Sequence, residues 1–321
     1  MPLPQDERIV SLANDLLQAF DKLFGVHPGF RPAHAKGELL SGTFTPAATA
    51  RQLSRAPHLN GGPIRVEARF SNSTGIPAIP DNTAEANPRG FAIRFFMGEH
   101  VHTDIVSHSL DSFPTHTPAE FLEFLHAAAQ SGPDVPSPKP IEKFLGSHPA
   151  ALAFVTANQP FPSSLARETY FGVTALAFTN AAGETKFGRY RIIPELGNDY
   201  LPAEQVSSLS PNYHFDEIVE RVTKSPIRFK IVVQVAAPTD ITDDSTVHWP
   251  EDREQIELGT VELNRVVANN PAEQQHIIFD PIPRVDGIEP SADPLLDVRA
   301  ALYLISGRRR RQAPNSAAAA S

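Results

Sequence analysis

The chain has 321 residues, a formal net charge of −9 at pH 7 and a pI near 5.7. Long-range repulsion therefore disfavours nucleic acid or an anionic membrane as the main partner, and a small or neutral substrate fits better. There is no cysteine, which excludes disulfides, thiolate metal sites and cysteine catalysis.

The first segment predicts an amphipathic helix, because Ile9, Leu12, Leu16 and Phe20 recur at helical spacing before Gly25. It lacks the basic start and apolar stretch of a secretory signal, and no later run approaches the roughly 18 apolar residues of a membrane span. We expect a cytoplasmic protein.

Several later segments predict strands. Val66, Ala68 and Phe70 alternate with charged residues, and FAIRFFM at 91–97 has the same character. A hairpin is expected around Ala182 and Gly183, and two more strands lie near 227–237 and 258–267. Short antiparallel strands with helices gathered at the ends indicate an α+β fold with a curved or closed sheet.

Two further helices carry strong end signals. Thr117, Pro118 and Glu120 form a capping pattern before FLEFLHAAAQ. The last predicted helix lies in SADPLLDVRAALYLISG, with Ser291 or Asp293 as its cap and Gly307 just past its end.

That last helix places Arg299 and Tyr303 on one face, a turn apart. A neighbouring cation favours an ionised phenol, so the pair is suited to form an anionic metal ligand, although such a spacing more often marks a surface pair. His34 lies in a loop-like stretch, and composition alone does not distinguish it from the other eleven histidines.

Several phrases in series resemble the signatures of the haem catalases. They are Arg31-Pro-Ala-His34, Ala68-Arg-Phe-Ser71, Asn87-Pro-Arg-Gly-Phe-Ala92, Gly287-Ile-Glu-Pro-Ser-Ala-Asp293 and Arg299-Ala-Ala-Leu-Tyr303. The likeness covers roughly residues 28–311. Because the chain is short and contains STGIPAIPDN, it is most similar to the small catalase-related peroxidases, which keep the haem barrel and lose peripheral extensions.

The resemblance implies a haem-catalase-like antiparallel barrel with surrounding helices that binds haem b through its iron. His34 would be the distal acid–base residue, Tyr303 the proximal iron ligand, and Arg299 the cation that keeps Tyr303 ionised. The other implied contacts to the haem or its surroundings are Arg31, Arg69 and Arg310 for propionates, Ser71 for the distal imidazole, and Phe121 for the porphyrin. The rest of the Arg308–Arg311 run is expected to face solvent.

One departure from the catalase pattern concerns the asparagine beside the distal histidine. Alignment through Asp104 and Val106 puts His108 at that position, with Asp111 as the alternative. The amide helps to hold peroxide, so its loss implies weak dismutation and leaves haem binding untouched.

The resulting hypothesis is a haem peroxidase that reduces hydrogen peroxide or an organic hydroperoxide with a small organic reductant. The alternatives are a true catalase, a hydroperoxide-rearranging haem enzyme and a non-catalytic haem-binding protein. We expect an N-terminal helical arm at 1–27, a catalase-like domain at 28–311 and a disordered tail at 312–321. The lost extensions, which normally wrap neighbouring subunits, favour a homodimer over an intertwined tetramer.

Overall fold

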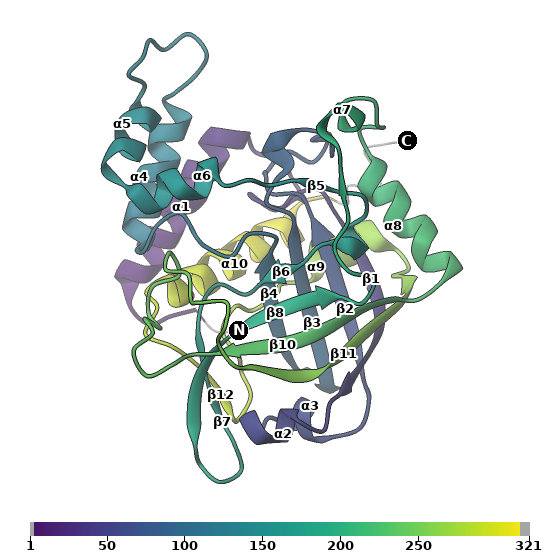
Figure 1. Cartoon of the computed structure of the whole chain (residues 1–321). Coiled ribbons are helices and arrows are strands. Elements are labelled where there is room, and N and C mark those ends of the chain that lie inside the picture. The colour runs from purple at the N-terminus through teal and green to yellow at the C-terminus, as the bar shows by residue number, and fades with distance from the viewer. Residues whose placement is uncertain (1–2, 315–321) are drawn as a thin grey trace.

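The computed structural model describes residues 3–314, which form an antiparallel barrel surrounded by helices (Figure 1). The strands are β1 (Gly37–Pro46), β2 (Ile64–Ser71), β3 (Gly90–Gly98), β4 (Val101–His108), β5 (Phe161–Pro162), β6 (Tyr170–Phe171), β7 (Leu176–Thr179), β8 (Thr185–Pro194), β9 (Tyr200–Leu201), β10 (Ile227–Val235), β11 (Gln255–Val266) and β12 (Ile288–Pro290). The α-helices are α1 (Glu7–Phe24), α2 (Ala50–Leu53), α3 (Pro57–Asn60), α4 (Pro118–Ala129), α5 (Pro140–Ser147), α6 (Pro149–Thr156), α7 (Ala203–Val206), α8 (Tyr213–Lys224), α9 (Asn270–His276) and α10 (Leu295–Gln312).

The barrel closes through eight strands in the order β1-β2-β3-β4-β6-β8-β10-β11, with β11 pairing back onto β1. β7 and β12 continue the sheet outward from β8. Every strand pair is antiparallel, so the α+β class with a closed sheet is confirmed. β1 and β4 were not among the strands expected from sequence pattern, since their residues lack a clear alternation.

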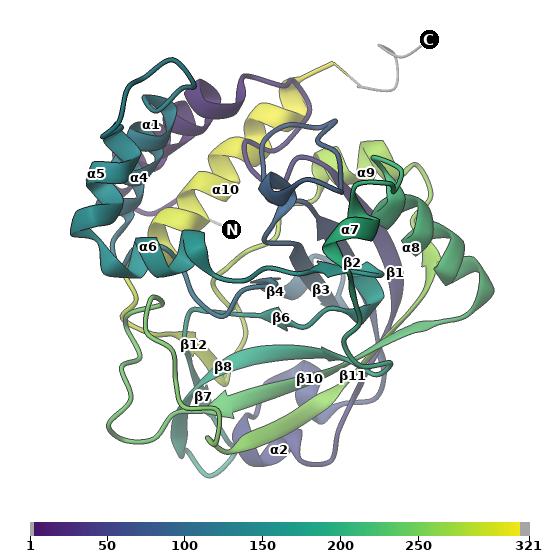
Figure 2. The same cartoon turned by 45° about the horizontal axis from the view of Figure 1, so that its top comes forward.

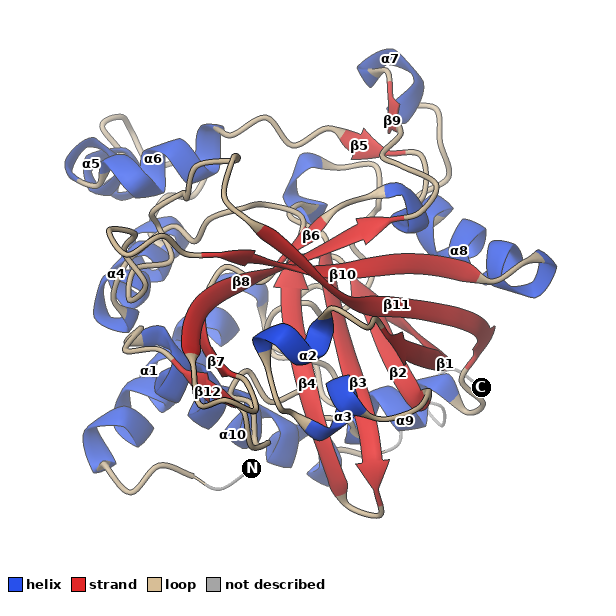
Figure 3. Cartoon of the chain, turned by 60° about the horizontal axis from the view of Figure 1, so that its bottom comes forward, coloured by secondary structure: helices blue, strands red, loops and turns tan. Residues whose placement is uncertain are grey.

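Aromatic side chains fill the barrel interior. Phe70 of β2 stacks on Phe91 of β3 with ring centroids 4.3 Å apart, and both rings contact Phe229 and Tyr170 from the opposite side. All four are essentially inaccessible to solvent. At one end of the barrel α2 and α3 add their apolar residues to the same core (Figure 3). This packing makes the barrel a solid support rather than a pore.

The outer face of β2, β3 and β4 is also covered. Because side chains alternate between faces, Arg69 and Ser71 point away from Phe70, and yet both are buried. The alternation at 64–70 predicted the strand correctly, whereas the burial of its outward residues depends on the helices packed over them.

Helices α1, α4 and α10 form the layer opposite this face, with α10 between the barrel and the α1/α4/α5/α6 group (Figure 2). The α4 capping box between Thr117 and Glu120 is present as predicted. No helix of residues 3–314 has the length and apolar character needed to cross a membrane. Of the predicted disordered tail, residues 315–321 lie outside the described residues.

The predicted end of the last helix is wrong. α10 continues through Gly307 to Gln312, and Asp293 accepts a hydrogen bond from the Leu295 amide at its start. Gly307 lies inside the helix, at a position where a Cβ would collide with the side chain of Ile278. The glycine therefore permits close packing, although its position resembled a helix terminator.

Candidate active site

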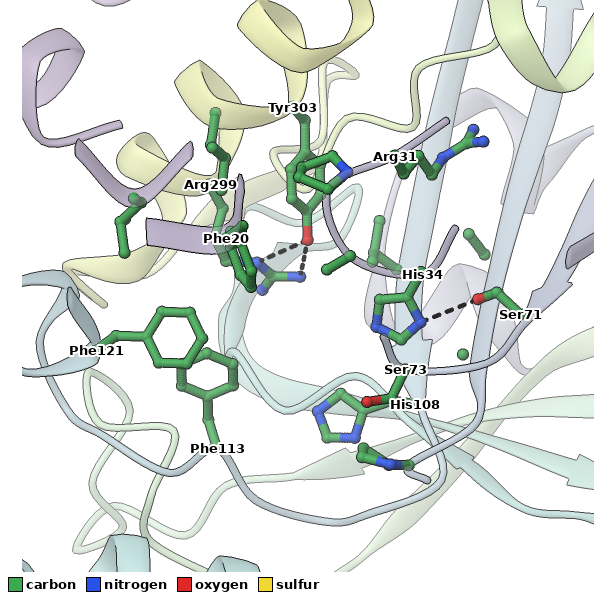
Figure 4. A pocket seen from close by; sticks show the side chains of 18 of the residues that line it. Phe20, Arg31, His34, Ser71, Ser73, His108, Phe113, Phe121, Arg299 and Tyr303 are labelled. Carbon is green, nitrogen blue, oxygen red and sulfur yellow. Dashed lines mark hydrogen bonds between the residues drawn. The ribbon is translucent and has the colours of Figure 1, made fainter. Parts of the chain in front are cut away.

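A cavity of about 420 Å³ lies between the outer face of β2–β4 and helices α1, α4 and α10 (Figure 4). Nine of the ten candidates from the sequence line it, all except Asp111: Arg31, His34, Arg69, Ser71, His108, Phe121, Arg299, Tyr303 and Arg310. Segments from both ends of the chain meet here, because α1 packs against α10. Their chemical roles are taken up as proposals below.

His34 is held over the sheet by its neighbours in the loop before β1. Its backbone has a φ of 56°, its amide donates to the Ser73 carbonyl, and its Nδ1 lies 3.1 Å from Ser71 Oγ. The ring lies against Gly90, where a Cβ would come within 2.7 Å of Nδ1 and closer still to Ser71 Oγ. Strand pairing sets Gly90 opposite Ser71, so glycine provides the space for the imidazole.

The electrostatics of this position keep the His34 ring neutral. Burial, followed by the charges of Arg69 and Arg31, lowers the pKa of His34 to about 4. Within residues 3–314, Nε2 makes no hydrogen bond, so the ring offers a free nitrogen to the cavity. A neutral imidazole of this kind can accept a proton at neutral pH.

The two candidates for the position beside His34 are separated by the register of β4. His108 pairs with Gly90 and lines the cavity. Asp111 lies beyond the strand, where its carboxylate accepts a hydrogen bond from Arg191 at 2.8 Å, and it is not among the residues that line the cavity. The alternative placement of Asp111 is therefore wrong, and its partner Arg191 explains why.

His108 presents a donor rather than an acceptor to the cavity. The Leu110 amide donates to His108 Nδ1 at 3.3 Å, which assigns the ring proton to Nε2 in the neutral form. Burial, with smaller contributions from His34 and Arg299, lowers the pKa of His108 to about 3 and keeps the ring neutral. An imidazole N–H here can donate a hydrogen bond as a side-chain amide would.

α10 carries Tyr303 and Arg299 along the other side of the cavity. The Nε and Nη2 atoms of Arg299 each lie 3.4 Å from the Tyr303 hydroxyl, as the i,i+4 spacing predicted (Figure 4). Two donors on one oxygen would stabilise negative charge there. The arrangement is suited to a phenolate that binds a metal ion.

Three further arginines form what we call the arginine cage: Arg31, Arg69 and Arg310. Arg69 and Arg310 are each 3% exposed, and within the described chain Arg310 Nε has no hydrogen-bond partner. Burial and then the neighbouring guanidiniums lower the pKa of Arg69 to about 9 and that of Arg310 to about 8. No Asp or Glu of residues 3–314 lines the cavity, so the cage is suited to bind an anion.

The Arg308–Arg311 run is divided by the turn of α10. Arg310 enters the cage and Arg308 faces solvent, as expected. Arg309 does not face solvent freely, because it forms an ion pair with Asp21 of α1 at 2.5 Å. Arg311 donates to the His276 carbonyl. The partial burial of Arg309 follows from the packing of α1 on α10.

Aromatic rings form the remaining wall. Phe121 packs on Phe113 at 4.9 Å and edge-on against Phe20 at 6.0 Å, and all three line the cavity. Phe121 thus both packs against other aromatic rings and lines the cavity. A wall of ring faces and edges opposite a peptide sheet suits a flat apolar ligand.

Comparison with known proteins identifies the family. A family model described as Catalase matches residues 27–318. The chain belongs to the catalase family. This family member is 32% identical over 302 residues to a catalase-related peroxidase of Synechococcus elongatus, an alignment that covers 92% of this chain and 88% of that protein. It is 33% identical over 293 residues to a catalase-related peroxidase of Mycolicibacterium paratuberculosis, with 89% and 90% covered.

The fold agrees with this assignment. A fungal catalase crystal structure superposes with a TM-score of 0.78 at 22% identity and covers 97% of this chain. The chain spans 63% of the length of that catalase, against about nine-tenths of the two catalase-related peroxidases. The predicted membership of the small subgroup is confirmed, and the difference in coverage reflects the shorter chain.

The residues of this catalase-family site fit haem on three counts. The cavity has an aromatic wall for a flat macrocycle, a cationic cage for carboxylates, and an unblocked phenol for iron. Sequence reasoning missed several lining residues, among them Phe20, Ser73 and Phe113. It also missed Gln274, which contacts the cage. The helical spacing of Phe20 indicated only that it lies on the apolar face of the first helix. Ser73, Phe113 and Gln274 carry no spacing signal, since they reach the cavity only through tertiary packing.

Proposed function

We propose that this chain is a haem b peroxidase that reduces hydrogen peroxide or organic hydroperoxides with a small organic electron donor. Its support is one observation: a neutral histidine and a cation-paired tyrosine line the same cavity, which also holds an arginine cage. The near full-length likeness to two proteins named catalase-related peroxidase agrees with it.

When bound, haem would supply the redox-active iron at which the O–O bond of a peroxide is broken. Tyr303 would hold the iron through its phenolate oxygen, and Arg299 would stabilise the charge on that oxygen. Arg31, Arg69 and Arg310 would bind the carboxylates of the porphyrin. Phe121 would pack against its ring.

His34 would transfer a proton between the two oxygen atoms of the peroxide. Its Nε2 accepts the proton of an incoming hydroperoxide and returns it to the departing oxygen, which leaves as water or an alcohol. Ser71 Oγ holds the opposite ring nitrogen, so the imidazole keeps its orientation during both transfers. His108 donates from Nε2 and helps to orient the bound peroxide.

A peroxidase is favoured over a catalase by the character of His108. Dismutation requires a second hydrogen peroxide to be oriented in the same small space, and a bulky single donor orients it less well than an amide. Electron donation from an organic reductant does not require a second peroxide to be oriented in this space.

The test is titration of the purified protein with hemin. We expect a Soret band that saturates at about one haem per chain, and we expect a Tyr303→Phe variant to bind hemin with a different spectrum and lower affinity. A protein that takes up no hemin would overturn the proposal. With the loaded protein, oxidation of an organic donor indicates a peroxidase, release of oxygen indicates a catalase, and rearrangement of a lipid hydroperoxide indicates an isomerase. The absence of all three activities indicates a haem carrier.

The proposal includes a homodimer in the cytoplasm. The homodimer rests on the comparison with a fungal catalase, of whose length the chain spans 63%. Light scattering of the loaded protein should give twice the mass of 35.0 kDa, and a tetramer would contradict it.

A further inference from the structure

Among residues 3–314, the amino-terminal end of β1 has no strand partner on one side. β1 pairs with β11 only from Leu40 onward. Just before that point the Leu39 carbonyl accepts a hydrogen bond from the Val267 amide, and residues 37 and 38 lie beyond the end of this ladder. Two amide side chains of α9, one turn apart, take that place. Asn270 accepts from the Leu39 amide and donates to the Leu39 carbonyl, and Gln274 donates to the Gly37 carbonyl at 2.9 Å.

These bonds determine which way the Gln274 amide faces. Its Nε2 donates to the Gly37 carbonyl and to Asn270 Oδ1, so both amide hydrogens are used. Oε1 is therefore the acceptor for the remaining neighbour, Arg69 Nε, at 2.7 Å. The orientation follows from the donor count, and a flipped amide would lose all three bonds.

Gln274 also contacts the second arginine of the cage. Its backbone carbonyl accepts from Arg31 Nη1 at 3.1 Å, and Arg31 Nη2 donates to the Ile277 carbonyl. These carbonyls belong to the carboxyl end of α9, where the helix dipole favours cations. One residue thus contacts two guanidiniums whose like charges repel each other.

A neutral side chain at this position leaves the charge of the cage available. Glu38 acts on Arg69 from β1, but burial raises the pKa of Glu38 to about 7, which weakens its effect as an anion. Gln274 orients Arg69 without neutralising it. The cage is thereby preorganised for a carboxylate ligand.

We propose that Gln274 is a positioning residue that holds Arg31 and Arg69 in the orientation needed to bind the carboxylates of the cofactor. The inference rests on the proposed function, in which that cofactor is haem. It assigns to Gln274 a role in affinity for the carboxylate groups, distinct from its role in docking α9 onto β1.

The experiment compares hemin with hemin dimethyl ester, which has the same ring and no carboxylates. Affinities are measured by Soret titration of wild type and Gln274→Met, a variant that keeps the length of the side chain and loses its hydrogen bonds. We expect hemin affinity to fall on the order of tenfold, the effect of one misplaced charge-assisted bond. Affinity for the ester should change by less than about twofold, because the ester makes no ionic bond with the cage.

Gln275→Met is the matched control. Gln275 is the same residue type on the same helix, and it donates to the carbonyls of Arg310 and Ala313 without contacting the guanidiniums of Arg31 or Arg69. We expect this variant to bind both ligands with a nearly constant ratio of affinities. If Gln274→Met does not fold, Gln274→Leu tests the same idea, since it also removes the hydrogen bond to Arg69 without adding a charge, and it should weaken hemin binding and spare the ester.

The outcomes are separable. Equal losses for hemin and ester would reduce Gln274 to a structural role and overturn the inference, as would no loss for either ligand in both Gln274 variants. Wild-type protein that binds neither ligand would instead overturn the proposed function. Wild type that binds both equally well would show that the cage does not bind carboxylates, and the inference would fail while haem binding stands.

Discussion

The two walls of the cavity are built in different ways. On the barrel wall, strand register and hydrogen bonds position His34, Ser71 and His108 around the bare backbone of Gly90. On the helical wall, rings such as Phe20 and Phe121 are positioned by van der Waals contact with each other, and their side chains make no hydrogen bonds. A sheet ladder holds polar groups in one geometry, whereas packed rings define a shape. Substitutions should therefore alter reaction rates on the barrel wall, and stability or cofactor retention on the helical wall.

The largest effect is expected from His34→Ala. Loss of the acid–base group should slow the reaction with peroxide by about 10²–10⁴-fold, and haem should still bind through the opposite side of the cavity. Stopped-flow absorbance of the haem-loaded protein measures the rate. His126→Ala, the same change at an exposed position of α4, is the control. An unchanged rate would remove His34 from its proposed role.

Gly90→Ala tests the barrel wall without deleting a functional group. The added methyl would displace the His34 ring and the Ser71 hydroxyl, and a displacement of about 1 Å can cost on the order of 10²-fold in rate. Gly62→Ala, where a Cβ meets nothing within 4 Å, is the matched control. If the Gly90 variant reacts as fast as wild type, the close fit of His34 is not required for the reaction.

Lowering the pH should destabilise the apoprotein, because the buried His108 ring is neutral in the folded state. Because its folded pKa of about 3 lies below the ordinary value of 6.5, the unfolded chain takes up a proton first and stability falls as pH decreases from about 6.5 to 3. This group contributes a slope of up to about 1.4 kcal/mol per pH unit.

Raised pKa values of Glu38 and Glu168, each to about 7, act in the opposite direction in the whole protein. The measurement is therefore the difference in free energy of unfolding between wild type and His108→Asn by urea titration at pH 7 and pH 5. At pH 5 the free energy of unfolding of the variant, relative to that of wild type, should be higher than it is at pH 7. A difference independent of pH would contradict a neutral buried His108.

In the loaded enzyme, His108→Asn should shift the balance of activities. The smaller amide leaves more room and more donors for a second peroxide, so oxygen release relative to donor oxidation should rise on the order of tenfold. Both are measured on one preparation. If the wild-type protein already releases oxygen rapidly and oxidises little donor, then the enzyme is a true catalase and His108 orients the second peroxide adequately.

The smallest effect is expected on the helical wall. Thr117→Ala removes the cap of α4 and should lower the free energy of unfolding by about 1 kcal/mol. Thermal unfolding reports this loss. The peroxide reaction should be unchanged, since α4 carries no group that handles the proton. A large fall in rate would mean that the two walls are more closely coupled than their construction indicates.

Much of the fold could be predicted from local pattern. Helices α1 and α4, the strands β2 and β3 and the β7–β8 hairpin were all expected, because periodicity and capping act over a few neighbouring residues. Helices α5, α6, α8 and α9 were not. The end of α10 was misjudged at Gly307, where contact with Ile278 rather than local conformation requires glycine.

The sequence by itself determined the family, the barrel and the residues that meet in the cavity, because their motifs occur in series and each motif is local. Only the tertiary structure decided between His108 and Asp111, since His108 at the end of β4 lines the cavity and Asp111 beyond the strand binds Arg191. It also decided the burial of Arg69 and the contact of Gln274 with the arginine cage. Those contacts join segments about 200 residues apart, and no local propensity encodes such a distance.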